Sequence, residues 1–424
     1  MPPSEASHSV SAGFKRYGAR LPLLALFAAN TVSLIGNRLS DLVIPWFVLE
    51  TTGSAGKTGL IGAVITVPLI LSAFFGGALV DRVGFRTTSV VADVASGLTV
   101  ALIPLLHMTV GLEFWQLLVL VFLGAILDSP GHVARQSLFP DLVELAGIRL
   151  ERANAASQVI WRLSWLLGPP LAGMLIALLG TSNVLWLDAG SFAVSALLIG
   201  LAVPATRSRA SREPSPSVRG YLSELAVGIT VILRDRLILL LETAATLGNA
   251  LGAALFAVGL PIYALRTFND ATALGLLLGG FGGGALVGAV IFGVVESRVS
   301  QRRLFIGAQL AGIIPYWILA FEPSLELGIT ATVLAGLASG PFGPIIMAVF
   351  QRRVPADVRG RFFGAAYALD NATTPLVVLL AGLLSEVFTL GMMLALVATV
   401  NLAVTVAVVT RPVLRELDAP HRSA

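Results

Sequence analysis

The chain has 424 residues, of which 56% are hydrophobic and only 12% are charged, and its mean hydropathy is +0.87. A water-soluble globular protein is excluded, because a chain with so few polar residues cannot cover its own surface with polar groups. The sequence contains no cysteine, which excludes disulfide bonds, thiolate metal sites and cysteine nucleophiles. Its four histidines are widely scattered, and we expect no metal site.

Twelve apolar segments follow one another along the chain, each long enough for the roughly 20 residues that cross the hydrocarbon core of a bilayer. The predicted membrane-spanning helices are 21–49, 56–80, 88–109, 114–134, 153–178, 183–203, 237–265, 271–295, 303–321, 327–350, 361–387 and 390–410. The first follows basic residues, as a secretory signal would, but it is too long and lacks a clear cleavage site, so we expect it to be retained. The predicted fold class is therefore an all-α polytopic membrane protein.

Lysine and arginine are concentrated in every second gap between these segments. Only Lys57 and Arg266 lie in or at the edge of the alternate gaps, and only Arg38 and Arg162 lie well inside predicted spans, away from their ends. Because positively charged residues stay in the cytoplasm during insertion, both termini are predicted to be cytoplasmic. We attribute the formal charge of +4 to insertion and expect no nucleic-acid partner. The preference for arginine over lysine, with abundant Ala and Gly, indicates a GC-rich bacterial genome, so we expect the membrane to be the cytoplasmic (inner) membrane of a bacterium.

The segment 204–224 is the one long polar interruption, rich in Arg, Ser and Pro. We predict a cytoplasmic linker there, between an N-terminal six-helix half at 1–203 and a C-terminal six-helix half at 225–424. Similar landmarks recur at separations of 216, 215 and 215 residues, namely Pro45 with Pro261, Asp81 with Glu296, and Pro140 with Pro355. This spacing indicates a duplicated unit, as in many transporter folds.

Two local motifs interrupt the apolar pattern. A charged turn after the second span contains Gly77, Asp81, Arg82, Gly84 and Arg86. Glycine permits a tight turn, and the Asp and Arg side chains can bond one another and the neighbouring helix ends. In the fifth span, the run GPPLAG at 168–173 would break a soluble helix, but neighbouring membrane helices can compensate for the lost backbone hydrogen bonds.

The charged turn resembles the loop signature of the major facilitator superfamily, and the run at 168–173 resembles the antiporter motif of exporters in that superfamily. The second resemblance departs at Ala172, where a glycine is usual, and at Ser164, four residues before Gly168. It implies twelve transmembrane helices in two pseudo-symmetric six-helix bundles, with a charged latch that holds one conformation. The implied latch residues are Gly77, Asp81, Arg82, Gly84, Arg86, Asp93 and Arg135, and the implied antiporter-motif residues are Gly168, Pro169 and Gly173.

The segments 44–49, 91–93, 134–138 and 414–418 resemble one group within this superfamily, the actinobacterial Tap-like multidrug efflux pumps, which are related to macrolide and siderophore exporters. In that group an Asp usually follows the glycine of the first span, whereas here Asn37 follows Gly36, and Arg38 and Asp41 come after it. The resemblance implies a monomer that expels amphipathic or cationic small molecules by alternating access. The proton gradient would drive export, and no cofactor is expected.

Ionisable side chains within the spans are costly, at about 2.5–3.5 kcal/mol each on insertion scales, and they are therefore candidates for proton transfer. The proton-coupling candidates are Asp41, Glu242, Asp128 and Asp370. Arg38 lies three residues before Asp41 and can pair with it, and Arg162 can pair with Asp128 across two antiparallel helices. An acid that meets its arginine in only one conformation can act as a proton switch, and a fixed ion pair that orients helices is the alternative.

Aromatic and amide side chains near the implied central cavity are candidates for contact with a bulky apolar substrate. They are Asn37, Trp46, Trp161, Trp165, Asn249, Phe256, Tyr263, Tyr367 and Asn371. Lipid-facing walls and interfacial belts use the same aromatic residues, so each assignment has a structural alternative.

Two other functions stay open. A dedicated exporter of an endogenous lipid or siderophore would share the fold and change the cargo. A membrane enzyme or a non-transporting scaffold is disfavoured, because the sequence shows no nucleophile–base set and no metal cluster. The run Gly-Lys-Thr at 56–58 is not a phosphate-binding loop, because Thr51 stands where such a loop requires its first glycine. With no ATP-binding motif, we expect an ion gradient to supply the energy. The expected partners are small drug-like substrates, protons and membrane lipids.

Overall fold

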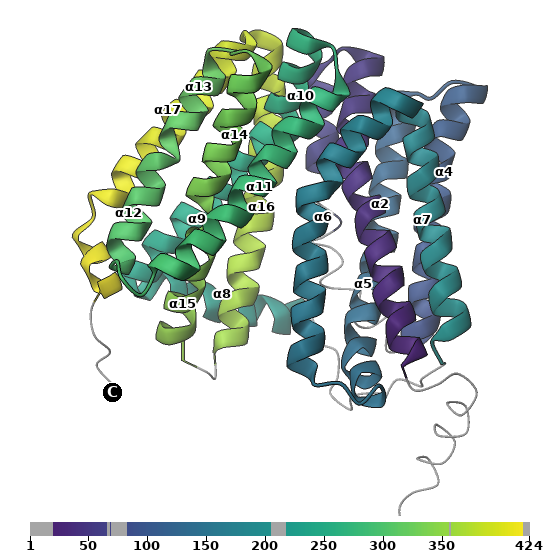
Figure 1. Ribbon diagram of the computed structural model, residues 1–424, viewed down its shortest axis with the longest axis horizontal. Helices are drawn as coiled ribbons and strands as arrows, with labels where there is room; N and C mark the ends of the chain where they lie inside the picture. The colour runs from purple at the N-terminus through teal and green to yellow at the C-terminus, as the bar shows by residue number, and fades with distance from the viewer. Residues whose placement is uncertain (1–19, 66–67, 69–82, 205–217, 356–357, 419–424) are drawn as a thin grey trace, which may run out of the picture. The chain divides into compact units, whose positions relative to one another are not determined.

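The computed structural model describes residues 20–65, 68, 83–204, 218–355 and 358–418 (Figure 1). Every regular element within these ranges is a helix. The chain divides into two compact units. Unit 1 comprises residues 1–43, 67–168 and 178–215, and unit 2 comprises residues 44–66, 169–177 and 216–424. The predicted halves at 1–203 and 225–424 stay a prediction.

Eleven segments in the described ranges are long and apolar enough to cross a membrane. Five of them lie wholly or mostly in unit 1: α2 (Leu21–Thr52), α4 (Phe85–Thr109), α5 (Phe114–Leu145), α6 (Leu150–Leu179) and α7 (Thr181–Ala202). In unit 2 they are Arg236–Phe268, α11 (Ala271–Val295), Gln301–Ala320, Leu325–Arg353, α16 (Arg359–Val387) and α17 (Leu390–Val409). Each corresponds to a predicted span, because a long apolar run is a local property of the sequence.

The second predicted span, at 56–80, is described only in part. A shorter apolar helix covers Ala55–Ile65, and most of the remainder lies outside the described residues. The structure also extends the fourth span, predicted at 114–134, to Leu145. Residues 135–145 are too polar to be recognised as membrane-spanning from hydropathy, although they continue the same helix.

The seventh span, Arg236–Phe268, is built from four consecutive pieces. The α-helices α9 (Arg236–Ala254) and α10 (Leu260–Tyr263) alternate with two π-helical turns, η1 (Leu255–Gly259) and η2 (Ala264–Phe268). Pro261 lies between the two π-helical turns; proline has no backbone N–H to donate, and its ring crowds the preceding turn. Wider π-helical turns accommodate such an interruption without ending the helix.

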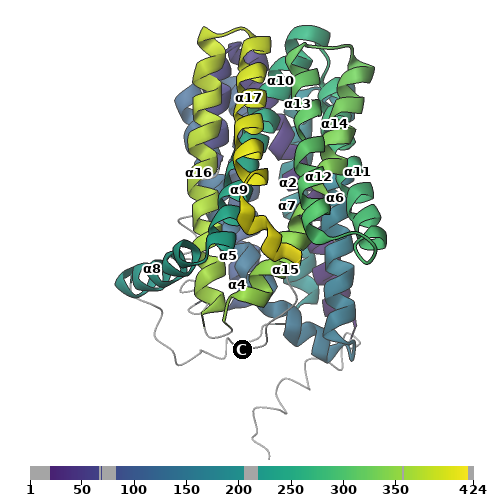
Figure 2. The same ribbon diagram turned by 90° about the vertical axis from the view of Figure 1, so that its left-hand side faces the viewer.

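The segment 204–224 differs from the prediction at its C-terminal end. The structure begins the helix α8 (Val218–Arg234) inside the predicted linker, whereas residues 205–217 lie outside the described part. Within unit 2, α8 runs across the direction of α16 and packs against it (Figure 2). A Cβ at Gly228 would overlap the carbonyl oxygen of Arg361 and lie 2.6 Å from Ala365 Cβ. Glycine at this position therefore permits the helices to meet.

Each unit has its own apolar core. In unit 1, α4 packs against α5 and α7, and the cluster at one end of the bundle contains Leu23, Leu26, Leu138, Leu142 and Ile199. In unit 2, α9 packs against α16, α11 against α14 (Leu325–Ser339), and α13 (Ile313–Ala320) against α17. Its core cluster includes Ile238, Leu241, Phe305, Phe350 and Phe362.

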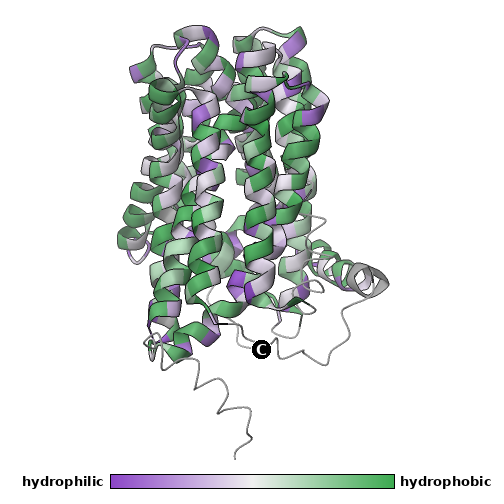
Figure 3. Ribbon diagram, turned by 90° about the vertical axis from the view of Figure 1, so that its right-hand side faces the viewer, coloured by the Kyte–Doolittle hydropathy of each residue, from purple (hydrophilic) through white to green (hydrophobic). Residues whose placement is uncertain are grey.

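Large apolar side chains also cover much of the accessible surface. Apolar residues predominate along the upright helices, and polar ones gather near their ends (Figure 3). Leu24, Leu98, Leu178 and Leu376 are each more than half exposed. A surface of this kind is stable in lipid and unstable in water, so the chain is a multi-pass membrane protein.

Candidate functional site

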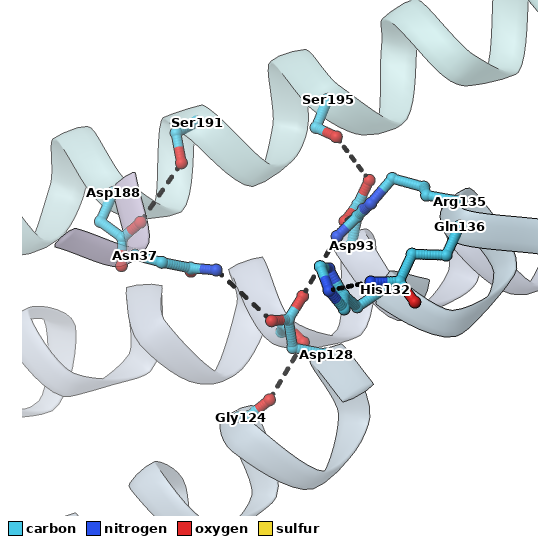
Figure 4. Close-up of polar contacts among 11 residues, drawn as sticks. Asn37, Asp93, Gly124, Asp128, His132, Arg135, Gln136, Asp188, Ser191 and Ser195 are labelled. Carbon is cyan, nitrogen blue, oxygen red and sulfur yellow. Dashed lines mark hydrogen bonds and ion pairs between the residues drawn. The ribbon is translucent and has the colours of Figure 1, made fainter. Parts of the chain in front are cut away.

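Polar side chains from four helices form a continuous chain across unit 1 (Figure 4). Asn37 on α2 donates a hydrogen bond of 3.5 Å to Asp128 on α5. The guanidinium of Arg135, on the same helix α5, lies 3.6 Å from the other oxygen of Asp128 and 2.6 Å from Asp93 on α4. Ser195 on α7 donates a hydrogen bond of 2.7 Å to the second oxygen of Asp93. One arginine thus joins two carboxylates and links all four helices.

The Asp93–Arg135 pair is almost entirely removed from solvent, with side-chain exposures of 0% and 3%. Two charges can be buried together at tolerable cost when their geometry is good and further hydrogen bonds satisfy them, as Ser195 does here. The structure therefore brings together Asp93 and Arg135, two of the residues implied for the latch. The implied latch residues Gly77, Asp81 and Arg82 lie outside the described part of the chain.

The described end of the charged turn leads into α4. Gly84 has φ of 89°, a left-handed backbone conformation that side chains other than glycine rarely adopt. Arg86 donates to the carbonyl oxygen of Gly200, in the last turn of α7. A guanidinium there lies at the negative end of the helix dipole, which stabilises both the charge and the helix end.

The first-span charges form a second group in unit 1. Arg38 and Asp41 lie 2.5 Å apart on consecutive turns of α2, which is the pairing that their spacing allows. The guanidinium carbon of Arg38 lies 4.0 Å from the ring centroid of Trp165 on α6, a cation–π contact. A Cβ at Gly168 would lie 2.6 Å from Arg38 Cβ, so glycine leaves room for this side chain. The first glycine of the 168–173 run thus contacts the first-span ion pair.

The predicted Asp128–Arg162 pair stays a prediction, because the side chain of Arg162 lies outside the described part. Within the described residues, Asp128 faces Arg135 and Asn37 instead. The remainder of the 168–173 run belongs to unit 2, where the helix continues through Pro169. A Cβ at Gly173 would lie 2.9 Å from the Cα of Gly275 on α11, so these glycines permit two helices to approach closely.

A third group lies in unit 2, between α9 and α16. Asp370 accepts hydrogen bonds of 2.7 Å from Thr246 and 3.3 Å from Asn249. Glu242, one turn before Thr246, is buried, and its Oε1 has no hydrogen-bond partner among the described residues. The two carboxyl groups interact electrostatically, and no described ion pair includes either of them. Two neighbouring acids without a cation are an arrangement that favours binding of a proton.

Comparison with known proteins places this geometry in a family. The family described as the Major Facilitator Superfamily matches residues 26–248 and again residues 243–423. The chain belongs to the major facilitator superfamily. Its ion-paired and hydrogen-bonded charges therefore lie within a transporter, and the chain is not an enzyme.

Several relatives resemble this facilitator over nearly its whole length. The multidrug efflux pump Tap of Mycolicibacterium fortuitum is 31% identical over 401 residues, which are 93% of this chain and 97% of that protein. The protein of the same name from Mycobacterium tuberculosis is 31% identical over 408 residues, or 95% and 96% of the two chains. The macrolide efflux protein A of Streptococcus pyogenes is 19% identical and covers 87% of this chain and 90% of its own. Among solved structures, the nucleoside transporter NupG matches with a TM-score of 0.71 and 12% identity, over 92% of this chain and 98% of that one.

The structure separates the predicted substrate-contacting residues of this facilitator by exposure. Trp46 and Tyr263 are buried, and Tyr263 donates to the carbonyl oxygen of Pro323, so neither is accessible to a substrate in this conformation. Trp161, Trp165 and Tyr367 are exposed. The two tryptophan rings meet edge to face at 6.0 Å. These three side chains are accessible from outside the protein, and a role in substrate contact stays a prediction.

The remaining candidates contact protein groups. Phe256 meets Phe281 on α11 with ring centroids 4.6 Å apart, and Asn371 donates to the carbonyl oxygen of Tyr367 in its own helix. Asn37 and Asn249 donate to the acids Asp128 and Asp370, as described above. Each of these two amides therefore orients a carboxyl group in this conformation, and a role in substrate contact stays a prediction.

Among the side chains that the structure describes, one buried acid was not singled out by the sequence analysis. Asp188 on α7 is 1% exposed and accepts hydrogen bonds from Ser40 on α2 and from Ser191, three residues further along its own helix. The signal in the sequence was a lone acid within the apolar run around it, in the sixth predicted span. Nothing in the sequence indicated that Ser40, 148 residues away on another helix, is its hydrogen-bond partner.

Proposed function

We propose that this facilitator is a proton-coupled efflux antiporter, which exports amphipathic or cationic small molecules by alternating access as protons enter. The observation that carries the proposal is the pair of acids in unit 2: a buried Glu242 with an unsatisfied oxygen beside an Asp370 that only hydroxyl and amide groups hold among the described residues. The names of the Tap and macrolide efflux relatives support export of drug-like compounds.

Proton coupling follows from the cost of placing two negative charges next to each other away from water. In the described conformation one of the two acids holds a proton, because no cation in the described residues compensates a second charge. When the seventh span moves and water reaches Glu242, ionisation becomes favourable and the proton leaves. The π-helical turns within the same span supply a place where its geometry can change.

The cargo would meet the charges of unit 1. Asp41 is paired with Arg38, but its side chain is about half exposed, and a cationic substrate can compete with Arg38 for its charge. Trp161 and Trp165 offer apolar rings at this position, which suits the hydrophobic part of an amphipathic molecule. A substrate that displaces Arg38 would couple binding to the ion pair of the first span.

The proposal includes a location and a state of assembly. We propose a monomer in the inner membrane of a bacterium, with both termini cytoplasmic and with no cofactor. Support comes from the alternation of arginine-rich gaps along the chain and from the bacterial origin of the efflux relatives. Labelling of cysteines introduced at the termini of this cysteine-free chain would test the orientation directly.

The experiment is a proton-release assay with purified protein in tight liposomes that have an acidic lumen. Addition of chemically unrelated cationic drugs to the outside is expected to cause saturable, drug-dependent loss of luminal protons, which empty liposomes do not show. Competition between unrelated drugs supports a multidrug pump. Drug movement without proton movement contradicts the proposal, and proton release with a single lipid or siderophore alone would assign the dedicated-exporter alternative.

A further inference from the structure

We infer that Asp188 and Ser40 form a proton-binding site in unit 1, separate from the acids of unit 2. In this structure Asp188 carries the proton, and it releases the proton to water when a displacement of α2 exposes the acid. The inference deepens the proposed function and rests on it for its role in transport. Protonation of Asp188 itself can be measured without any transport.

The surroundings of Asp188 suit a protonated carboxyl group. Both of its oxygens are met by hydroxyl groups: Ser40 donates to one, and Ser191 donates to the other at 3.2 Å. A hydroxyl group can donate or accept, so Ser40 can hydrogen-bond to either the neutral or the ionised form of the acid. Asp188 can therefore gain or lose a proton while the same two hydroxyl groups remain its hydrogen-bond partners.

Compensating charge is scarce around Asp188. Asp188 interacts electrostatically with two other acids, Asp41 on α2 and Asp128 on α5. Asp93 on α4 and Arg135 on α5 extend the same polar group. Arg135 is engaged with Asp93 and Asp128, and the other described arginine of this region, Arg38, is paired with Asp41. Ionised Asp188 would therefore add an uncompensated negative charge in a buried site, which the protonated form avoids.

The contact between Asp188 and Ser40 depends on a close approach of α2 to α7. A Cβ at Gly36, one turn before Ser40, would overlap both Ser191 Oγ and Asp188 Oδ1. A larger side chain at this position would force Asp188 and Ser191 to move, so glycine keeps Ser40 against the acid in this arrangement. A small shift of α2 along or about its axis would therefore remove the Ser40 hydroxyl.

The helix α2 is also the element through which such a shift can reach the site. Its residues up to Val43 belong to unit 1 and those from Ile44 belong to unit 2. Ser40 lies one turn from this boundary. A conformational change that displaces α2 would expose Asp188 to water, which accepts its proton, and return of Ser40 after reprotonation would restore the neutral, buried state. Each cycle moves one proton and makes no covalent change.

Infrared difference spectroscopy of the purified full-length protein tests the protonation directly. A protonated carboxyl group has a C=O stretching band above the amide region, and this band shifts on exchange into D2O. We expect the wild-type protein to show a band that Asp188→Asn lacks. Ser40→Ala is expected to move the same band to higher wavenumber, since loss of a hydrogen bond strengthens the C=O bond. Glu242→Gln is the matched control, which removes a different carboxyl group and leaves the Asp188 band in place.

Transport assays on the same variants separate this inference from the proposed function. Asp188→Asn is expected to lose drug-dependent proton release while it still exchanges drug down a gradient. Absence of an Asp188-dependent band in the wild-type protein overturns the inference, even if proton-coupled export is observed. If the band is present but wild-type protein moves no protons with any drug, the proposed function fails and the proton site stands. Ser40→Ala leaves the acid in place, so it tests the inference even if Asp188→Asn fails to fold. A shift of the carboxyl band in Ser40→Ala supports a protonated Asp188 bonded to Ser40, and an unchanged band contradicts it.

Discussion

Arg135 on α5 lies 2.6 Å from Asp93 on α4, and neither side chain has appreciable contact with solvent. The same guanidinium lies 3.6 Å from Asp128, so a single cation serves two carboxylates in the core of unit 1. The two acids are not equivalent, because Asp93 is fully buried and Asp128 is partly exposed.

This asymmetry predicts different effects of removing each partner. Arg135→Ala leaves Asp93 buried without a cation, and we expect it to lower the free energy of unfolding by about 3–5 kcal/mol, as for other broken buried ion pairs. Asp128→Asn should cost much less, because the Asp93–Arg135 pair remains. Thermal unfolding in detergent, followed by tryptophan fluorescence, measures both. Equal losses for the two variants would contradict the assignment of Asp93 as the principal partner.

Asp235 predicts how stability depends on pH. Burial disfavours its charged form, but backbone N–H donors of Ile238 and Leu237 together with Arg353 outweigh burial and hold the pKa of Asp235 below its ordinary value of 3.8. A lowered pKa in the folded state means that the stabilisation is fully present above the unfolded pKa and is lost as pH falls through the folded value. We therefore expect wild-type protein to lose stability below about pH 4 more steeply than Asp235→Asn does.

The Asn variant is informative because asparagine also caps helix N-termini, so it removes the charge and keeps the hydrogen bonds to α9. Asp235→Ala removes both, and should cost a further 0.5–2 kcal/mol or so at neutral pH. Melting temperatures of the three proteins between about pH 3 and pH 6 give the comparison. Parallel pH profiles for wild type and Asp235→Asn would show that the carboxylate charge contributes nothing.

Gly168 should be intolerant of a larger side chain. Gly168→Val would push against the stem of Arg38 and displace its guanidinium from Trp165, and overpacking of this kind costs about 1–3 kcal/mol. We expect lower stability, altered Trp165 fluorescence and reduced drug export. Gly190→Val on α7 is the matched control, because a Cβ at Gly190 would meet nothing within 4 Å. Similar losses in both variants would show that the Arg38 contact is not the cause.

Glu242 and Asp41 are expected to be needed for uphill transport. Glu242→Gln and Asp41→Asn remove an ionisable group and keep its size, so both proteins should insert normally and lose accumulation-driven efflux, by roughly tenfold or more if each supplies one coupled proton. Export from vesicles with and without an imposed proton gradient measures this. Glu326→Gln, at the exposed start of α14, is the control. Unchanged uphill efflux in both test variants would remove these acids from the coupling mechanism.

The positions of the spans could be read from the sequence with good accuracy. The eighth predicted span, 271–295, coincides with α11, and eleven of the twelve predicted spans have a counterpart among the described membrane-spanning segments. Length and apolarity are local properties, and the bilayer demands the same length of every crossing helix. The Arg38–Asp41 pair was foreseeable for the same reason, since residues three apart share a helix face.

Contacts between helices could not be derived in this way. Asp93 and Arg135 are separated by 42 residues, and Ser40 and Asp188 by 148. Whether such side chains meet depends on the rotation of each helix about its axis and on glycines such as Gly36 that set how closely helices approach. The burial of Tyr263 depends equally on packing against neighbours, and so does the helix α8, whose first residues lie in the predicted linker.

The sequence alone thus determined that this is a membrane protein, which segments cross the membrane, and which charged residues lie within those segments. Only the tertiary structure decided which of those charges share a counter-ion and which, like Asp188 and Glu242, are buried without one among the described residues. The physical reason is that hydropathy acts on each segment separately, whereas the cost of a buried charge depends on the groups that neighbouring helices bring within a few ångströms of it.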